Sequence, residues 1–169
     1  MRVKVCGITQ VEQLVKLPDI GATFAGLIFY PKSPRYVLRH MTTSQIKKET
    51  NTNKVGVFVN ATFEEIASKT DIHKLDYIQL HGNESPEFCL KLEKKIPIIK
   101  AFSIDENFDF ETLKKYSESC TYFLFDTKGK NHGGKGMAFD WNILENYKLE
   151  KKYFLSGGIS LENVSDLKE

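Results

Sequence analysis

Lys4-Val5-Cys6-Gly7-Ile8-Thr9 covers the end of the first predicted strand and the turn that follows it. Side chains two residues apart on a strand share one face, so Lys4 and Cys6 place two polar groups together at the strand's C-terminal end. An open nucleotide-binding sheet would favour a GxGxxG turn here, and Cys6-Gly7-Ile8-Thr9 lacks that pattern. The stretch therefore favours a closed (β/α) barrel, whose active site is built from the loops after its strands.

Beyond this stretch, short apolar runs alternate with amphipathic stretches of helix length. Strands separated by single helices predict parallel βαβ units with right-handed crossovers. The predicted strands are residues 2–6, 24–29, 54–59, 77–80, 98–102, 122–125 and 153–155, and the predicted helices are 11–17, 44–50, 63–69, 86–95, 110–116 and 141–147. Thr62 before Glu65, and Ser85 before Pro86, are typical helix starts.

Polar residues at the ends of other strands support the barrel. Gln79 and His81 share a face at the end of one strand, Asp126 closes another, and Lys100 lies near the end of a third. We predict an α/β protein of the (β/α)8 TIM-barrel class, with residues 1–169 forming a single domain. The chain holds about seven βα units, with the eighth strand and helix missing, whereas a typical barrel needs about 200 residues or more. We therefore expect a C-terminally incomplete barrel.

Composition narrows the function. Hydrophobic residues make up 41% and charged residues 27% of the chain, as in a soluble globular protein. A net charge of +2 gives no basic field for nucleic acid. No apolar run approaches the roughly 20 residues needed to cross a bilayer, and the start of the chain leaves no room for an export signal, so we expect no membrane association and a cytoplasmic location. The three cysteines, Cys6, Cys89 and Cys120, are too widely spaced to indicate a disulfide framework or a zinc site.

Considered singly, several candidate residues also have a purely structural interpretation. A lone Cys6 is more often a small buried hydrophobic residue, and the same holds for Cys89 and Cys120. For Gln79 and His81, a role in supporting a site and a role in packing are about equally expected.

The motifs together are more specific, because seven occur in order along the whole chain. In this set the sequence resembles the phosphoribosylanthranilate isomerases. The motifs are Lys4-Val5-Cys6-Gly7-Ile8-Thr9, Gly26-Leu27-Ile28-Phe29 with Ser33-Pro34-Arg35-Tyr36, Gly56-Val57-Phe58-Val59-Asn60, Gln79-Leu80-His81-Gly82, Phe125-Asp126-Thr127, Gly133-Gly134-Lys135-Gly136 with Phe139-Asp140-Trp141, and Ser156-Gly157-Gly158-Ile159 with Glu162-Asn163-Val164.

The resemblance implies an Amadori rearrangement of N-(5-phosphoribosyl)anthranilate to 1-(2-carboxyphenylamino)-1-deoxyribulose 5-phosphate, a step of tryptophan biosynthesis. It implies Asp126 as the general acid that protonates the furanose oxygen and Cys6 as the general base that removes the proton from C2. Lys4 is a candidate to stabilise the Cys6 thiolate. For Asp126 we expect partial burial to keep the carboxyl protonated near neutral pH.

The resemblance also implies how substrate is held. Arg35 matches the position that receives the anthranilate carboxylate, and Gly157 and Gly158 match a phosphate-binding turn followed by a helix start. Gln79 and His81 are further substrate-binding candidates. The implied cover over the site is the loop with Gly133, Gly134 and Gly136.

No cofactor or metal is required for this reaction. We expect the protein to be a monomer or a homodimer. Its expected binding partner is the small-molecule substrate. Two other interpretations stay open. One is a catalytically inactive barrel fragment, and the other is a related phosphate-binding barrel such as indole-glycerol-phosphate synthase, whose lysine acid and glutamate pair fit this sequence less well than Cys6 does.

Overall fold

The fold is an open half-barrel of seven parallel strands. The computed structural model describes residues 2–48, 51–127 and 140–167. Each strand pairs with the next one along the chain, in the order β1-β2-β3-β4-β5-β6-β7, and β1 and β7 are the two edges. The strands are β1 (Lys4–Cys6), β2 (Phe24–Ile28), β3 (Asn53–Phe58), β4 (Tyr77–Leu80), β5 (Ile98–Ile104), β6 (Tyr122–Thr127) and β7 (Tyr153–Leu155).

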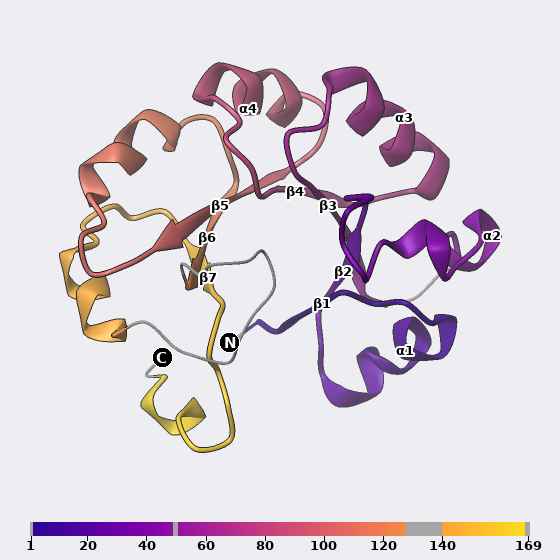
Figure 1. Ribbon diagram of the computed structural model, residues 1–169, viewed down its shortest axis with the longest axis horizontal. Helices are drawn as coiled ribbons and strands as arrows, with labels where there is room; N and C mark the ends of the chain where they lie inside the picture. Colours follow the sequence, from indigo (N-terminus) through magenta and orange to yellow (C-terminus); the bar gives the residue numbers. More distant parts are fainter. Residues whose placement is uncertain (1, 49–50, 128–139, 168–169) are drawn as a thin grey trace.

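This order confirms the predicted barrel class. A doubly wound sheet would place β1 in its interior, because the strand order reverses there. Here the strands follow one another around an arc and the helices lie on its outer side (Figure 1). The helices are α1 (Val11–Lys16), α2 (Thr43–Ile46), α3 (Phe63–His73) and α4 (Pro86–Glu93), with 3₁₀ segments η1 (Pro18–Ile20), η2 (Val37–Arg39), η3 (Phe110–Tyr116), η4 (Trp141–Asn146) and η5 (Val164–Asp166). None of the helices in the described ranges could span a membrane.

The predicted helix starts are confirmed at two sites. Thr62 accepts a hydrogen bond from Glu65 N at 3.1 Å, and Ser85 accepts one from Phe88 N at 3.3 Å. The helical segments predicted over 110–116 and 141–147 are present, and both are 3₁₀ rather than α-helical. Length alone does not decide the type, because α1 and α2 are α-helical over six and four residues. The 3₁₀ form is frequent in short connecting segments such as these.

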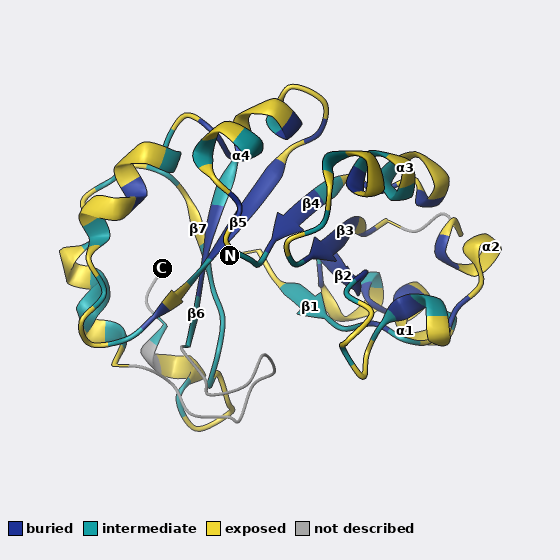
Figure 2. Cartoon of the chain, turned by 45° about the horizontal axis from the view of Figure 1, so that its top comes forward, coloured by how far each residue is buried: buried dark blue, intermediate teal, exposed yellow. Residues whose placement is uncertain are grey.

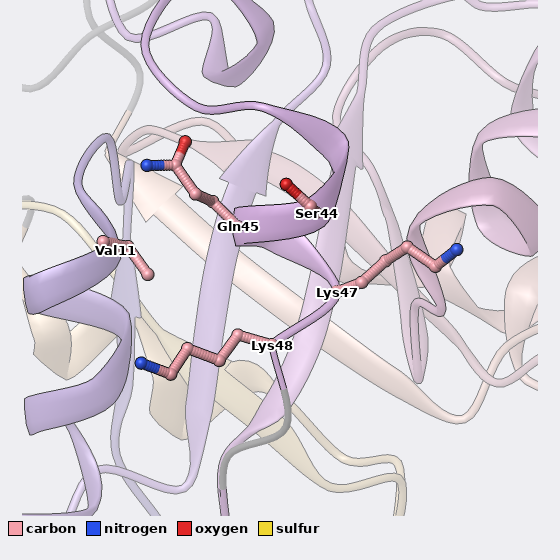
Figure 3. Close-up of a pocket in the computed structure, with 5 residues that line it drawn as sticks. All are labelled: Val11, Ser44, Gln45, Lys47 and Lys48. Carbon is pink, nitrogen blue, oxygen red and sulfur yellow. The ribbon is translucent and has the colours of Figure 1, made fainter.

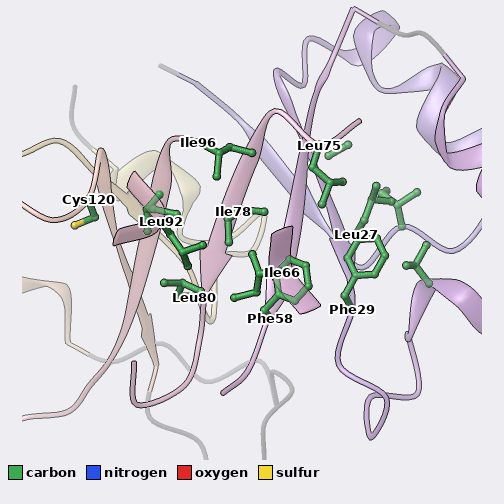
Figure 4. Close-up of a cluster of buried hydrophobic side chains, with 14 of the residues drawn as sticks. Leu27, Phe29, Phe58, Ile66, Leu75, Ile78, Leu80, Leu92, Ile96 and Cys120 are labelled. Carbon is green, nitrogen blue, oxygen red and sulfur yellow. The ribbon is translucent and has the colours of Figure 1, made fainter. Parts of the chain in front are cut away.

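Two separate apolar clusters hold the sheet. The larger lies between the strands and the outer helices and includes Phe58, Ile66, Ile78 and Leu92 (Figure 4). Burial follows the same layering, with β2 to β5 largely buried, the edge strands β1 and β7 less so, and the outer helix faces exposed (Figure 2). This cluster is what fixes the helices on the outside of the arc, in line with the predicted βα units.

The smaller cluster fills the concave side of the sheet. Its centre is Phe24 of β2, whose ring lies 5.3 Å from Tyr77 of β4 and 5.2 Å from Phe154 of β7, both edge to face. Val55 and Leu124 complete this layer. Aromatic side chains thus join β2 to β7 across the interior, although no backbone ladder joins β7 to β1 in the described chain.

A buried histidine makes stability depend on pH. His73 is 3% exposed, its ring centroid is 5.0 Å from that of Phe29, and its Nδ1 has no hydrogen-bond partner within the described part of the chain. Burial, together with the charges of Lys69 and Lys47, lowers the pKa of His73 from 6.5. The folded chain therefore keeps this ring neutral, and stability present above pH 6.5 is lost as pH falls through the lowered pKa.

We expect the urea midpoint to fall between about pH 7 and pH 5.5, and His73→Leu to remove most of that fall. His40→Gln serves as the control, because His40 is exposed and its ring contacts a loop carbonyl, Pro34 O, at 3.1 Å. Equal pH dependence in His73→Leu and the unaltered chain would contradict this expectation.

Candidate active site

Cys6 and Arg35 lie together at the C-terminal end of β1. The Cys6 thiol packs over Gly26 of β2, where an added Cβ would lie 2.7 Å from Sγ. Arg35 Nη1 donates to Cys6 O at 3.1 Å, and its guanidinium lies over Gly7, which has φ +87°. Both glycines therefore make room, one for the thiol and one for the guanidinium. Lys4 precedes Cys6 on the same face, as predicted, with Lys4 opposite Phe24 and Cys6 opposite Gly26.

The second group of candidates spans β4, β6 and β7. Gln79 Nε2 lies 3.0 Å from His81 Nδ1, and His81 Nε2 lies 3.5 Å from Asp126 Oδ2. Ser156, at the end of β7, also hydrogen-bonds Asp126 through its side chain. The His81 and Asp126 side chains are 26% and 29% exposed, which leaves both accessible to a small molecule. Gln79 is 2% exposed and supports the ring from beneath.

The expectation that burial keeps Asp126 protonated is wrong for the free chain. Burial does act to raise the pKa of Asp126, but hydrogen bonds from His81 and Ser156 and the charge of His81 act more strongly together, and the pKa is lowered from 3.8. The strand that precedes Asp126 is buried as predicted; the opposing groups come from β4 and β7.

Gly157 and Gly158 lie beside Asp126. Gly157 has φ +88°, and a Cβ there would meet Thr127 Oγ1 at 2.3 Å and Asp126 Oδ1 at 2.9 Å. Gly158 has φ +69°, and its carbonyl accepts a hydrogen bond from Asn163 Nδ2 at 2.8 Å. The helix expected after this turn is instead the three-residue 3₁₀ segment η5, too short to form the i→i+4 ladder of an α-helix.

Several other candidates are placed differently or are not placed. Lys100 does not share the inner face with Gln79 and Asp126: its side chain is on the outer face of β5, in register with Leu80 and Phe123, although it contributes to the lining of a cavity at the strand ends. The loop residues Gly133, Gly134 and Gly136 lie outside the described residues. Across residues 2–48, 51–127 and 140–167, no group of three or more His, Cys, Asp or Glu side chains could hold a metal ion.

The structure also shows residues that sequence reasoning missed. Gly26 and Gly7 shape the space around Cys6 and Arg35, and Ser156 contacts Asp126. A glycine inside a strand often marks a close approach, which was the available signal for Gly26. The Ser156 contact carried no comparable signal, because it depends on the β6–β7 pairing.

Two cavities differ in what they offer. One of about 360 Å³ lies at the ends of β3, β4 and β5 and is lined in part by His81 and Ser103. A larger one, about 580 Å³, lies between α1 and α2 (Figure 3). Its two cations, Lys47 and Lys48, point away from each other and it holds no candidate residue, so we place the site at the strand ends.

We expect the two remaining cysteines to be unreactive. Burial raises the pKa of Cys89 and of Cys120 to about 12 in each case. Cys6 is only partly buried, so it is the accessible thiol of the three.

Gly26→Ala tests the space beside Cys6. The added methyl group would displace Sγ, and we expect the rate at which a thiol reagent modifies Cys6 to change by about 10-fold or more, given how strongly reactivity depends on placement. Gly56→Ala is the matched control, because its Cβ would meet Leu75 Cδ1 at 2.5 Å on the outer face of β3. It should lower stability and leave Cys6 unaffected. Similar reactivity changes in both variants would count against the Gly26 assignment.

The fold and the site define an enzyme built on a (β/α) barrel, with acid–base groups at the C-terminal ends of its strands. Comparisons with known proteins give the family. Residues 3–169 match the family described as N-(5'phosphoribosyl)anthranilate (PRA) isomerase. The chain is 44% identical over 171 residues to the N-(5'-phosphoribosyl)anthranilate isomerase of Parabacteroides distasonis, covering 99% of this chain and 77% of that protein.

Solved structures agree with this match. Phosphoribosyl anthranilate isomerase from Thermotoga maritima superposes with a TM-score of 0.85 at 35% identity, covering 98% of this chain and 81% of that one. A phosphoribosyl anthranilate isomerase in complex with reduced 1-(o-carboxyphenylamino)-1-deoxyribulose 5-phosphate gives a TM-score of 0.80 at 33% identity, covering 98% and 80%. The chain belongs to the phosphoribosylanthranilate isomerase family, the isomerases of this step of tryptophan biosynthesis.

Proposed function

We propose that Asp126 and Cys6 are the general acid and general base of the isomerisation of N-(5-phosphoribosyl)anthranilate. The observation that carries the proposal is the pair of groups at one mouth: a partly accessible thiol beside a guanidinium, and a carboxyl contacted by His81. Asp126 would protonate the furanose oxygen as the ring opens to the Schiff base. Cys6 as thiolate would then take the proton from C2, giving the enolamine that becomes the ketose.

The proton of the acid needs a source. With its pKa lowered, Asp126 is ionised at neutral pH in the free chain. A bound substrate that excludes water strengthens the effect of burial, which is the influence that raises this pKa. The nitrogen Nε2 of His81 lies 3.5 Å from Oδ2 and is the group we assign to deliver or share the proton.

Substrate binding follows from the two charged ends of the molecule. A guanidinium can meet a carboxylate with two parallel hydrogen bonds, and Arg35 is already seated beside Cys6. Gly157 and Gly158, without side chains, would let backbone N–H groups approach the phosphate beside Asp126. The related enzyme solved in complex with reduced 1-(o-carboxyphenylamino)-1-deoxyribulose 5-phosphate supports a ligand with a carboxylate and a phosphate.

The proposal is tested by measuring turnover of phosphoribosylanthranilate, with the decrease in substrate fluorescence as the signal. We expect the chain to show turnover and Cys6→Ala to lower kcat by about 100-fold or more, the usual contribution of a general base. Cys120→Ala is the control, since Cys120 is buried with a pKa raised to about 12. Turnover that survives in Cys6→Ala would remove Cys6 as the base.

A further inference from the structure

A buried ion pair lies beside the loop that carries His81. Lys100 Nζ is 3.1 Å from Glu84 Oε2, and both side chains are 3% exposed. Removing two such charges from water costs several kcal/mol per ion, which their attraction offsets only with good geometry and further hydrogen bonds. A buried ion pair is therefore weak evidence for a stabilising role. The hydrogen bonds that the two side chains make indicate a different role.

The ammonium group binds the backbone on both sides of His81. Lys100 Nζ donates to Gly82 O at 2.8 Å and lies 3.4 Å from Leu80 O, the carbonyls of the residues after and before His81. It also contacts Ala101 O at 3.1 Å. With Glu84 there are four acceptors around three N–H donors, so Lys100 has no donor left for a ligand.

The carboxylate holds the same loop and ties it to the next one. Glu84 accepts from Gly82 N at 3.0 Å and 3.2 Å, and from Asn60 N at 2.9 Å. Asn60, in the loop after β3 with φ 51°, accepts from Asn83 N at 2.7 Å. The loops after β3 and β4 are thus locked together by one carboxylate.

As a result, the backbone is held on both sides of His81 and at the His81 amide. His81 N donates to Phe58 O at 2.9 Å, while Lys100 and Glu84 hold the flanking carbonyls and the Gly82 amide. The imidazole is then held between Gln79 and Asp126. The 3.5 Å separation from Asp126 leaves little tolerance, because hydrogen bonds weaken quickly beyond this distance.

We propose that Lys100 and Glu84 are positioning residues, whose buried ion pair fixes the loop so that His81 Nε2 stays against Asp126. The kinetic consequence rests on the proposed function. The geometric consequence does not, because the state of the His81 ring can be measured without turnover.

The test compares the chain with the double variant Glu84→Gln/Lys100→Met. Exchanging both charges for neutral groups of similar volume avoids leaving one charge buried alone, so this variant should fold. Long-range ¹H–¹⁵N spectra of chain labelled at its four histidines report the ring nitrogens directly. We expect the His81 signals of the unaltered chain to show one held tautomer, and those of the variant to move toward the averaged values of free imidazole. In the isomerase assay, kcat should fall about 10- to 100-fold with little change in KM.

Glu93→Gln is the matched control at the opposite end of β5. Glu93 accepts from Ile98 N and from Thr121 Oγ1, each at 2.6 Å, so its loss loosens the same strand without touching the loop of His81. Its His81 signals should match those of the unaltered chain. If the double variant does not fold, Glu84→Gln/Lys100→Gln, which also leaves no buried charge, gives the same comparison.

Unchanged His81 signals in the folded double variant would overturn the proposal, and so would equal shifts in Glu93→Gln, which would indicate general loosening. If the unaltered chain shows no turnover, the proposed function fails while the spectra still decide whether the ion pair positions His81.

Discussion

Asp126→Asn is expected to lower kcat by about 100- to 10,000-fold, the range typical of a lost general acid. Asparagine keeps the size of the side chain and can still contact His81, but it cannot transfer a proton to the furanose oxygen. Because the proposed binding groups Arg35, Gly157 and Gly158 are unchanged, we expect KM to change little. Stopped-flow measurement of ring opening would locate the loss at the acid-dependent step.

The matched control is Asp109→Asn. Asp109 caps η3 by accepting from Glu111 N at 2.9 Å and lies outside the site. Its variant should lose some stability and keep its turnover. An Asp126→Asn variant that retains a kcat within a factor of a few of the unaltered chain would rule out Asp126 as the acid, and His81 would then be the group to examine.

Lys100→Met should produce the largest loss of stability among these changes. The substitution leaves the Glu84 carboxylate 97% buried without its cation, and breaking such a pair typically costs about 3–5 kcal/mol. Urea unfolding gives the free energy of unfolding directly. The double variant Glu84→Gln/Lys100→Met should recover most of this loss, because no uncompensated charge remains.

Comparing the single and double variants decides whether the charge pair or the packing of the Lys100 side chain causes the loss of stability. If both lost the same free energy of unfolding, packing around the Lys100 chain would account for the effect and the ion pair would not. Lys114→Met provides a surface control, because Lys114 pairs with Glu111 while both side chains are well exposed. Such exposed pairs contribute about 0–1 kcal/mol.

Much of the arrangement could be predicted because alternation along a strand fixes which side chains share a face. Cys6, Gln79 and Asp126 were assigned to strand ends in this way, and the bounds of Tyr77–Leu80 and Tyr153–Leu155 are as predicted. Lys100 could not be assigned correctly. Both faces of a parallel strand in a barrel are covered, so β5 shows no periodic pattern that separates inside from outside.

The lowered pKa of Asp126 also could not be predicted from single segments of the sequence. Its pKa depends on His81, which comes from β4, and on Ser156, which comes from β7. Burial could be inferred from the apolar residues before Asp126, but the opposing hydrogen bonds exist only once β4, β6 and β7 are assembled. The same is true of Gly26, whose role is defined by the neighbouring strand.

The strand order has a consequence for how the protein is made. Every ladder joins strands that are neighbours along the chain, so each can form as soon as the second of the two strands has been synthesised. Cys6 and Arg35 belong to the first two units and can be in place early, whereas Asp126 acquires its Ser156 contact only after β7 emerges. The residues that contact the thiol are therefore all synthesised well before Ser156, which contacts the carboxyl.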